Sequence, residues 1–379
     1  MKVKIHSLFE YLLETTTQPV EAVLGFSLAT SPRLGDYLAD LDPAASLDWS
    51  NESFQGLNQL REHVIARAGL TGRCTPADVL ITAGTAEANY LAIMQLVQPG
   101  DEIIVDTPGW PQPLVLAEAI GAHVRPWRRR EADHWRLDIA ELRELISPRT
   151  RLIFLCNPSN PTGQILTAPE LNEIARIAAE VGAYLLCDEV YAGLEWAGDR
   201  VPAIAGLYER GISTGSVSKA LGLQGLRLGW LICRDKSLLF DAVILRENSS
   251  EIMNVMGERI AEIALREDRY AAAIARAKTE GRHNLALLDE FISQRPELSW
   301  QRPPAGLIGL ARLHLPIDSA ELARRLLAPP YRTFLLPGSA YGYPDHIRLG
   351  VGGGSAVNLP LGLSRLAQCL DDLAAAQGQ

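Results

Sequence analysis

The chain has 379 residues, of which 47% are hydrophobic and 21% charged, and its formal net charge is −9. This composition suits a globular protein with one large or two medium-sized cores, and the acidic balance argues against nucleic acid or an anionic membrane as a partner. The N-terminal stretch MKVKIHSLFEYLLETT has no long apolar core and no small-residue cleavage site, so we expect no signal peptide, and no apolar run approaches the length of a membrane span. The five cysteines are scattered without a CxxC pair, which predicts a reducing compartment, a cytoplasmic location and no structural metal.

Short apolar strands alternate with amphipathic helices through the middle of the chain. We expect strands at 79–82, 102–106, 151–156, 183–187 and 228–233, and helices at 86–96, 112–120 and from 167 onward. The last of these helices opens with a capping box, Thr167-Ala168-Pro169-Glu170. Strands that are apolar on both faces and separated by helices predict a mainly parallel sheet covered on both sides.

The C-terminal part has a different pattern. Residues 234–290 are predicted to be almost wholly helical, and short strands at 306–313 and 334–336 then alternate with helices. We therefore expect three parts: an N-terminal segment (1–40) that packs with the small domain, a large cofactor-binding domain (41–275) and a smaller α/β domain (276–379).

Lys219 is the most informative residue, because it is one of only five lysines and lies in Ser216-Val217-Ser218-Lys219, ahead of a glycine-rich run that ends near Arg227. A primary amine can condense with an aldehyde, small neighbours let a bulky cofactor approach, and a guanidinium can hold a phosphate. The alternative is a surface lysine in a glycine-rich turn.

Two further loops follow predicted strands, and in open α/β sheets ligands bind at the carboxyl ends of the strands. Gly84, Thr85 and Ala86 open a helix whose backbone N–H groups, with the threonine hydroxyl, would cradle a phosphate; the alternative is a capped turn. Trp110, which lies between two prolines, suits stacking on a planar ring; the alternative is a core tryptophan.

The next two loops carry polar side chains. The heptapeptide 157–163, Asn-Pro-Ser-Asn-Pro-Thr-Gly, predicts a rigid turn from which the Asn160 amide can donate to a phenolate oxygen. Asp188 ends a buried strand and must therefore be paired. A pyridinium nitrogen would keep Asp188 ionised, and the Tyr191 hydroxyl can join Asn160 at the phenolate oxygen; the alternative is a structural Asp–Arg pair.

In this order the motifs resemble those of the class I and II aminotransferases, the fold-type I enzymes that depend on pyridoxal 5′-phosphate (PLP). The resemblance covers roughly residues 40–355. It implies a large α/β domain with a mainly parallel seven-stranded sheet, a smaller α/β C-terminal domain, and a homodimer with active sites shared between the subunits. It also implies an amino-acid substrate and a 2-oxo acid acceptor.

The resemblance assigns a role to each motif residue. It implies that Lys219 forms the internal aldimine and moves the substrate proton, that Asp188 pairs the ring nitrogen, and that Arg348, in Ile347-Arg348-Leu349-Gly350, grips the substrate carboxylate in a bidentate fork. The remaining cofactor contacts are implied for Asn160 and Tyr191 at the ring hydroxyl, Trp110 on the ring, and Gly84, Thr85, Ala86, Ser216, Ser218 and Arg227 around the phosphate, with Asn160 also near the substrate.

The substrate-facing segments depart from the family pattern. Asn51 stands where most relatives have a tyrosine that reaches the partner subunit's cofactor phosphate, so we expect Asn51 to face the substrate and to favour a polar side chain. The segments 24–32 and 249–254 also depart, and the second lacks a common proline. For a cationic substrate, Asp36, Asp48 and Glu52 are candidates for an acidic wall.

Three functions are compatible with these motifs. The first is an amino-acid aminotransferase. The alternative is a non-transaminating PLP enzyme of specialised metabolism, a cyclase, eliminase or oxidase of a polar, arginine-like amino acid. It is suggested by standard cofactor motifs beside departing substrate-facing segments, a pattern similar to that of the branch that contains capreomycidine synthase, an enzyme that cyclises a hydroxylated arginine. The run Gly-Thr-Ala-Glu-Ala-Asn-Tyr at 84–90 is compatible with that branch. The third, the PLP-binding half of a transcription regulator, is disfavoured because the chain has neither room for a DNA-binding domain nor a basic patch.

Overall fold

The structure, a computed structural model, describes residues 2–15, 19–354 and 358–377. Its larger sheet has seven strands in the order β2-β8-β7-β6-β5-β3-β4. Neighbouring strands are parallel except for β8, which runs antiparallel to both β2 and β7. The strands are β2 (Val79–Thr82), β3 (Glu102–Thr107), β4 (His123–Arg128), β5 (Thr150–Cys156), β6 (Tyr184–Asp188), β7 (Gly211–Ser216) and β8 (Gly229–Cys233). The predicted mainly parallel seven-stranded sheet is confirmed.

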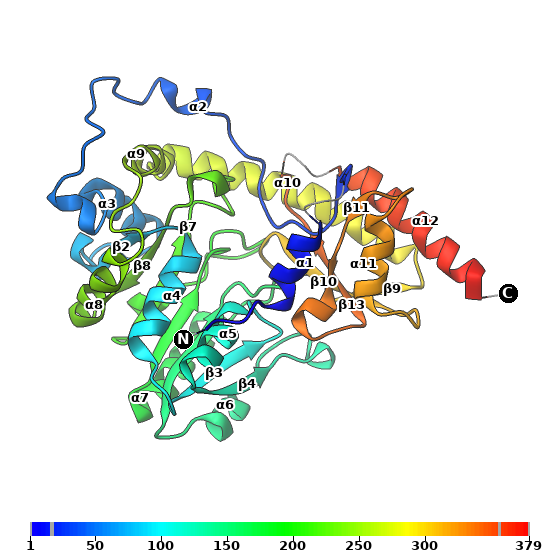
Figure 1. Cartoon of the computed structure of the whole chain (residues 1–379), viewed down its shortest axis with the longest axis horizontal. Coiled ribbons are helices and arrows are strands. Elements are labelled where there is room, and N and C mark those ends of the chain that lie inside the picture. The colour runs from blue at the N-terminus through cyan, green and yellow to red at the C-terminus, as the bar shows by residue number, and fades with distance from the viewer. Residues whose placement is uncertain (1, 16–18, 355–357, 378–379) are drawn as a thin grey trace.

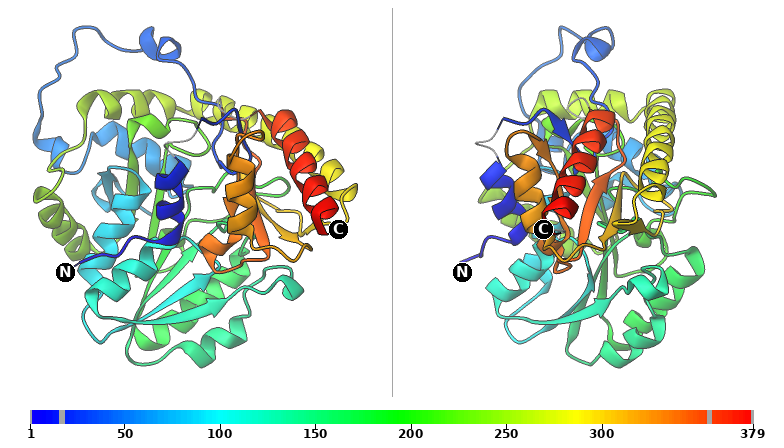
Figure 2. Two further views of the ribbon diagram at one scale, coloured as in Figure 1. Left: turned by 45° about the vertical axis from the view of Figure 1, so that its right-hand side comes forward. Right: turned by 90° about the vertical axis from the view of Figure 1, so that its right-hand side faces the viewer.

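Helices cover both faces of this sheet (Figures 1 and 2). Along β5, Phe154 packs in one buried cluster with α4, α5 and α8, whereas its neighbours Ile153 and Leu155 pack in another with α6 and α7. Successive strand side chains point to opposite faces, so a strand apolar at every position is buried on both sides. The helices around the sheet are α3 (Asn58–Arg67), α4 (Thr85–Leu96), α5 (Gln112–Ile120), α6 (Ile139–Leu145), α7 (Ala168–Val181), α8 (Lys236–Glu247) and α9 (Val255–Ala264).

The predicted start of α7 is confirmed. Glu170 accepts a hydrogen bond from the Thr167 backbone N–H at 2.7 Å, and the capping box is complete. The helix ends at Gly182, whose φ of 72° is the left-handed conformation that glycine adopts without a Cβ penalty.

The smaller sheet is antiparallel and has the order β12-β13-β10-β9. Its strands are β9 (Leu298–Trp300), β10 (Ile308–Leu313), β12 (Leu336–Pro337) and β13 (His346–Gly350), and α11 (Ser319–Leu327) and α12 (Leu359–Gln377) accompany them. The long helix α10 (Glu267–Ser293) runs from the large sheet to the small one (Figure 1). The predicted domain boundary at 275–276 lies inside this helix, and the boundaries stay a prediction.

The N-terminal segment contains α1 (Ser7–Thr15), β1 (Ala22–Val23) and α2 (Gly35–Leu38). Its first part lies against the small domain, where β1 pairs in parallel with β11 (Thr333–Phe334), whereas Asp40, just after α2, pairs with Arg269 at the start of α10. The Tyr11 hydroxyl donates to the Leu335 carbonyl at 2.8 Å. After α2 the chain arches away from the rest of the molecule before it reaches α3 (Figures 1 and 2). None of the helices described is long and apolar enough to cross a membrane.

Candidate active site

The motif residues gather at the carboxyl ends of the parallel strands, as the fold predicts. A cavity of about 250 Å³ opens there. Its lining includes ten of the residues predicted from the sequence, namely Thr85, Ala86, Trp110, Asn160, Asp188, Tyr191, Ser216, Ser218, Lys219 and Arg227. Side chains that lie up to 142 positions apart in the chain, from Thr85 to Arg227, therefore surround one space.

One end of the cavity is built to hold an anion. Helix α4 begins at Thr85, and Gly84 before it has a φ of 81°, so the first backbone N–H groups of the helix face this end. A Cβ at position 84 would lie 2.8 Å from the Arg227 guanidinium, which shows how closely that cation approaches the turn. Among the residues described, the buried Thr85 hydroxyl has no hydrogen-bond partner. An unsatisfied hydroxyl, a helix N-terminus and an arginine together fit the phosphate of PLP.

Asp188 lines the same cavity at the end of β6, with 6% of its surface exposed. Its Oδ1 accepts from the Val190 N–H at 3.2 Å and its Oδ2 accepts from the Asn89 amide at 3.1 Å. Burial raises the pKa of this carboxyl to about 6, although the Asn89 amide and the nearby Lys219 act in the opposite direction.

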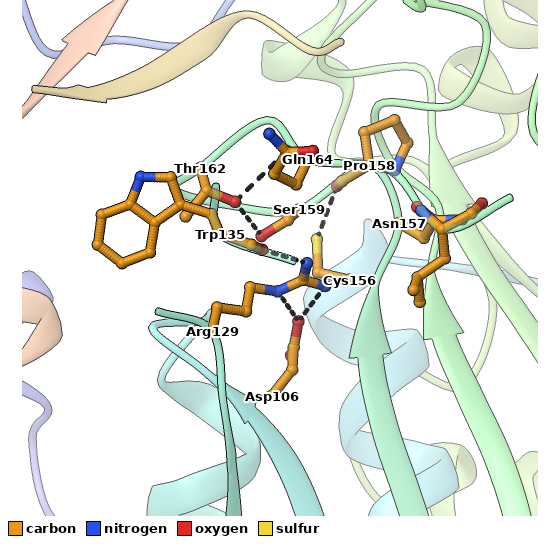
Figure 3. Close-up of polar contacts among 10 residues, drawn as sticks. Asp106, Arg129, Trp135, Cys156, Asn157, Pro158, Ser159, Thr162 and Gln164 are labelled. Carbon is orange, nitrogen blue, oxygen red and sulfur yellow. Dashed lines mark hydrogen bonds and ion pairs between the residues drawn. The ribbon is translucent and has the colours of Figure 1, made fainter. Parts of the chain in front are cut away.

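The sequence left open a structural Asp–Arg pair at Asp188, but the structure forms such a pair at Asp106 on β3, two strands away in the sheet. Arg129 donates from Nε and Nη2 to Asp106 Oδ2 at 3.2 and 3.1 Å, and its Nη1 donates to the Trp135 carbonyl (Figure 3). In the part of the chain that the structure describes, Asp188 has no arginine partner of this kind. Its carboxylate remains available to a cationic ring nitrogen.

Lys219 lines the same cavity, so the alternative of a lysine on the open surface is wrong. Burial, together with the positive charges of Arg348 and Arg227, lowers its pKa to about 8. The Lys219 amine donates to Ser27 Oγ at 3.3 Å, and the Tyr191 hydroxyl donates to the same oxygen at 2.8 Å. A lysine with a lowered pKa is neutral more often near pH 8, which suits a nucleophile or a base.

The loop that carries Asn160 is fixed by its own polar groups (Figure 3). The Asn157 side chain accepts from the Leu166 N–H at 2.8 Å and donates to the Leu166 carbonyl at 3.2 Å. The Thr162 hydroxyl donates to Ser159 Oγ at 3.0 Å, so both ends of the turn are held. This network positions Asn160 without using its side chain.

Arg348 reaches this loop from β13 in the small sheet. Its Nη1 donates to the Tyr341 hydroxyl at 2.8 Å and to Asn160 Oδ1 at 3.3 Å, and its Nη2 donates to the Gly25 carbonyl at 2.6 Å. Among the residues described, the buried Nε has no partner. Because Asn160 Oδ1 is used as an acceptor, its amide nitrogen is left to donate elsewhere.

Trp110 is half-buried and is attached to the anion-binding end. Its indole N–H donates to Gln112 Oε1 at 3.2 Å, and the Gln112 amide donates to the Ala86 carbonyl at 2.7 Å. The indole lines the cavity rather than filling the core, which favours the predicted stacking role.

Several functional candidates were missed by the sequence reasoning, namely Ser27, Asn89, Gln112 and Tyr341. Of these, Asn89 lay in the run singled out at 84–90, and Ser27 lay in the segment 24–32, which departs from the family pattern. Conversely, the proposed acidic wall does not form here, because Asp36, Asp48 and Glu52 do not line the cavity of this subunit. The side chain of Asn51 lies outside the part of the chain that the structure describes, so its substrate role stays a prediction.

Comparison with known proteins decides the family. Residues 52–366 match aminotransferase class I and II. The chain belongs to this family. It is 32% identical to capreomycidine synthase from Streptomyces vinaceus over 288 residues, which cover 75% of this chain and 73% of that protein. It is therefore a PLP-dependent enzyme of the aminotransferase type, as the motifs predicted.

Two solved structures extend the comparison to the whole fold. A PLP-dependent aminotransferase from Streptococcus suis superposes with a TM-score of 0.88 at 27% identity, covering 98% of this chain and 99% of that chain. The PLP-dependent cyclase OrfR superposes with a TM-score of 0.86, also at 27% identity, covering 98% of both chains. The predicted fold class and cofactor are confirmed, and this aminotransferase-family chain is similar both to transaminating and to cyclising enzymes.

Proposed function

We propose that this aminotransferase transfers the amino group of an α-amino acid to a 2-oxo acid, with Lys219 as the catalytic amine. The observation that carries the proposal is that Lys219 lines one cavity together with an anion-binding end and the buried carboxylate of Asp188. These are the groups needed to hold PLP by its phosphate and its ring nitrogen while an amine reaches its aldehyde.

Different residues of the cavity suit different parts of the cofactor. When bound, PLP supplies an aldehyde that reacts with amines and a ring that withdraws electrons from the substrate Cα. The amides at the start of α4, the Thr85 hydroxyl and Arg227 would hold the phosphate. Asp188 would accept a hydrogen bond from the ring nitrogen, and the Asn160 amide would donate to the ring oxygen. Trp110 would cover the ring.

Lys219 and Arg348 act on the substrate. The Lys219 amine, which its surroundings keep partly neutral, takes and returns the proton on Cα. The unpartnered Nε–H of Arg348 and the second N–H of its Nη2 form an edge that can donate to both oxygens of a carboxylate. Ser27 lies beside both Lys219 and Tyr191, so it can orient the amine.

A cyclase or another non-transaminating reaction is the second candidate, and the similarity to capreomycidine synthase and to the cyclase OrfR favours it. A half-reaction distinguishes the two functions. The enzyme, loaded with PLP, is mixed with each of a panel of amino acids that includes arginine, without a 2-oxo acid. An aminotransferase converts its PLP to pyridoxamine phosphate in proportion to the 2-oxo acid product. Retention of PLP while an amino acid is consumed would instead establish the second function.

We also propose a homodimer with shared active sites, located in the cytoplasm and without nucleic acid or membrane partners. Large apolar side chains are exposed on the arched segment, at Leu47 and Trp49, and on α8, at Phe240 and Ile244, which supports burial of this region against a second copy. The net charge of −9 and the five free, buried cysteines support the location. Light scattering after size-exclusion chromatography tests the dimer, since a monomer at micromolar concentration would contradict it.

A further inference from the structure

Asn89 is a fully buried side chain of α4, four residues after Thr85, with which the helix begins. It lines the cavity together with Asp188 and Lys219. Both ends of its amide are used: Nδ2 donates to Asp188 Oδ2 at 3.1 Å, and Oδ1 accepts from the Thr214 hydroxyl at 2.8 Å. The roles assigned above to phosphate-, ring- and substrate-binding residues do not involve it.

Thr214 fixes which way the Asn89 amide faces. Thr214 lies on β7 directly opposite Asp188 on β6, so its position is set by the register of two central strands. A hydroxyl donor at Asn89 Oδ1 places the NH₂ group toward the carboxylate. The opposite orientation would direct the amide oxygen at the Asp188 carboxylate, and two acceptors would then face each other.

We propose that Asn89 is a positioning residue that keeps the proton on the ring nitrogen of PLP by holding Asp188 as an ionised hydrogen-bond acceptor. This inference rests on the proposed role of Asp188 as the partner of that nitrogen.

The physical argument is a competition between two bases for one proton. Asp188 and the ring nitrogen share it, and the ring withdraws electrons effectively only while the proton stays on nitrogen. Burial favours the neutral, protonated acid and so draws the proton toward Asp188. Each donor to the carboxylate favours the ionised form and so returns the proton to the ring.

Two donors act on Asp188 in the structure. The Val190 N–H on Oδ1 belongs to the backbone, and the Asn89 amide on Oδ2 is the side-chain donor that mutation can remove. The charged groups nearby oppose one another, because Lys219 favours the carboxylate whereas Asp106 disfavours it. The Asn89 amide is the largest of the influences that lower the pKa of Asp188.

The test measures the proton directly. Wild type, Asn89→Leu and Asn89→Ala are loaded with PLP labelled with ¹⁵N in the ring, and the ¹⁵N chemical shift reports whether the nitrogen is protonated. A hydrogen bond to a charged group typically changes such an equilibrium by roughly tenfold or more. In both Asn89 variants we expect the protonation equilibrium of the ring nitrogen to change by that factor toward the unprotonated form. Thr214→Val frees the Asn89 amide to turn, so we expect a smaller change in the same direction.

A second measurement does not need the cofactor. In the apoprotein, ¹³C-labelled aspartate reports the titration of Asp188, and loss of Asn89 should raise the midpoint by about one pH unit, the equivalent of tenfold. Asn284→Leu is the matched control, because this buried amide donates to the Val351 carbonyl and has no contact with Asp188. It should leave both signals unchanged.

The outcomes separate the inference from the function on which it rests. If Asp188→Asn changes the ring signal but Asn89→Leu and Asn89→Ala leave it and the apoprotein titration as in wild type, Asn89 does not have this role. If Asp188→Asn itself leaves the ring signal unchanged, Asp188 is not the ring partner, and the inference is overturned with it. If Asn89→Leu does not fold, Asn89→Ala and Thr214→Val decide the question.

Discussion

Arg348→Lys tests how this enzyme recognises a carboxylate, because it keeps the positive charge and removes the fork. In the structure the Arg348 Nη1 is occupied by Tyr341 and Asn160, and one N–H of Nη2 by the Gly25 carbonyl. Among the residues described, Nε has no partner, and under the proposed function it donates to the substrate together with the remaining N–H of Nη2. An ammonium replaces this planar edge by a single point, so one of the two bonds to the carboxylate is lost.

The expected loss follows from that one bond. A hydrogen bond between charged groups contributes about 1.5–3 kcal/mol, which corresponds to a rise of roughly 10- to 150-fold in KM. Steady-state kinetics with the best amino acid of the panel measure the rise, and absorbance of the bound cofactor shows that PLP is retained. The matched control is Arg312→Lys on the neighbouring strand β10, where a half-exposed arginine pairs with Glu131 and makes no hydrogen bond to Asn160 or Tyr341.

The result that would refute this reasoning is equally specific. If Arg348→Lys loses PLP while KM stays as in wild type, the arginine stabilises the contact between the two sheets and does not bind the substrate. If Arg312→Lys raises KM as much as Arg348→Lys does, the effect comes from disturbance of the small sheet.

Four further variants test other parts of the site. Borohydride should leave a pyridoxyl group on Lys219, and Lys219→Ala should lose the adduct and lower kcat by roughly 10²–10⁴-fold, the usual contribution of a general base. Asp188→Asn keeps the shape of the side chain and removes its charge. Transition-state stabilisation should fall by several kcal/mol, so kcat/KM should decrease roughly 10²-fold or more. Asn51→Tyr should shift the amino-acid preference from polar toward less polar side chains. Glu189→Gln should raise the melting temperature at pH 8 but not at pH 5, because burial raises the pKa of Glu189 to about 7 whereas an unfolded glutamate titrates near 4.5.

Each of these predictions has a contrary result. An adduct on any other lysine removes Lys219 from its role, and near-normal turnover of Asp188→Asn removes Asp188. A wild type that prefers phenylalanine or tyrosine contradicts the reading of Asn51. For Glu189 the raised folded-state pKa means that stability is lost as the pH rises from about 4.5 through 7; an equal gain for Glu189→Gln at both pH values would show that its charge is not the cause.

The fold was predictable where burial requires aliphatic side chains. The strands predicted at 79–82 and 151–156 agree with β2 and β5 to within one residue. β7 was missed, because Gly211-Ile212-Ser213-Thr214-Gly215-Ser216 contains one aliphatic residue. It is nevertheless buried throughout, since its polar side chains are bonded to other buried groups: Ser213 donates to Glu189 at 2.7 Å, and Thr214 to Asn89. Partners distant in sequence make such a strand stable, and a local pattern does not contain them.

The same reason explains which residues of the site could be predicted from the sequence and which could not. Lys219, Asp188 and Arg227 were predictable because cofactor chemistry demands particular residue types at the ends of strands. Asn89 and Gln112 were not, because their importance comes from which neighbour they bond across the fold: Asp188 lies 99 residues away from Asn89, and Ala86 lies 26 away from Gln112. A serine or asparagine side chain is compatible with many environments, so the amino-acid sequence alone does not identify its hydrogen-bond partner.

The N-terminal segment joins the two groups to which we assign the substrate. Ser27 accepts hydrogen bonds from Lys219 and Tyr191, and two residues earlier the Gly25 carbonyl accepts from Arg348. One short stretch of chain therefore contacts both Lys219 and Arg348, to which we assign the substrate proton and the substrate carboxylate. This is also the stretch, 24–32, in which the sequence departs from the family pattern. Since Ser27 and Gly25 touch neither Arg227 nor the start of α4, we expect a change of residue here to alter the surroundings of the Lys219 amine and leave the anion-binding end as it is.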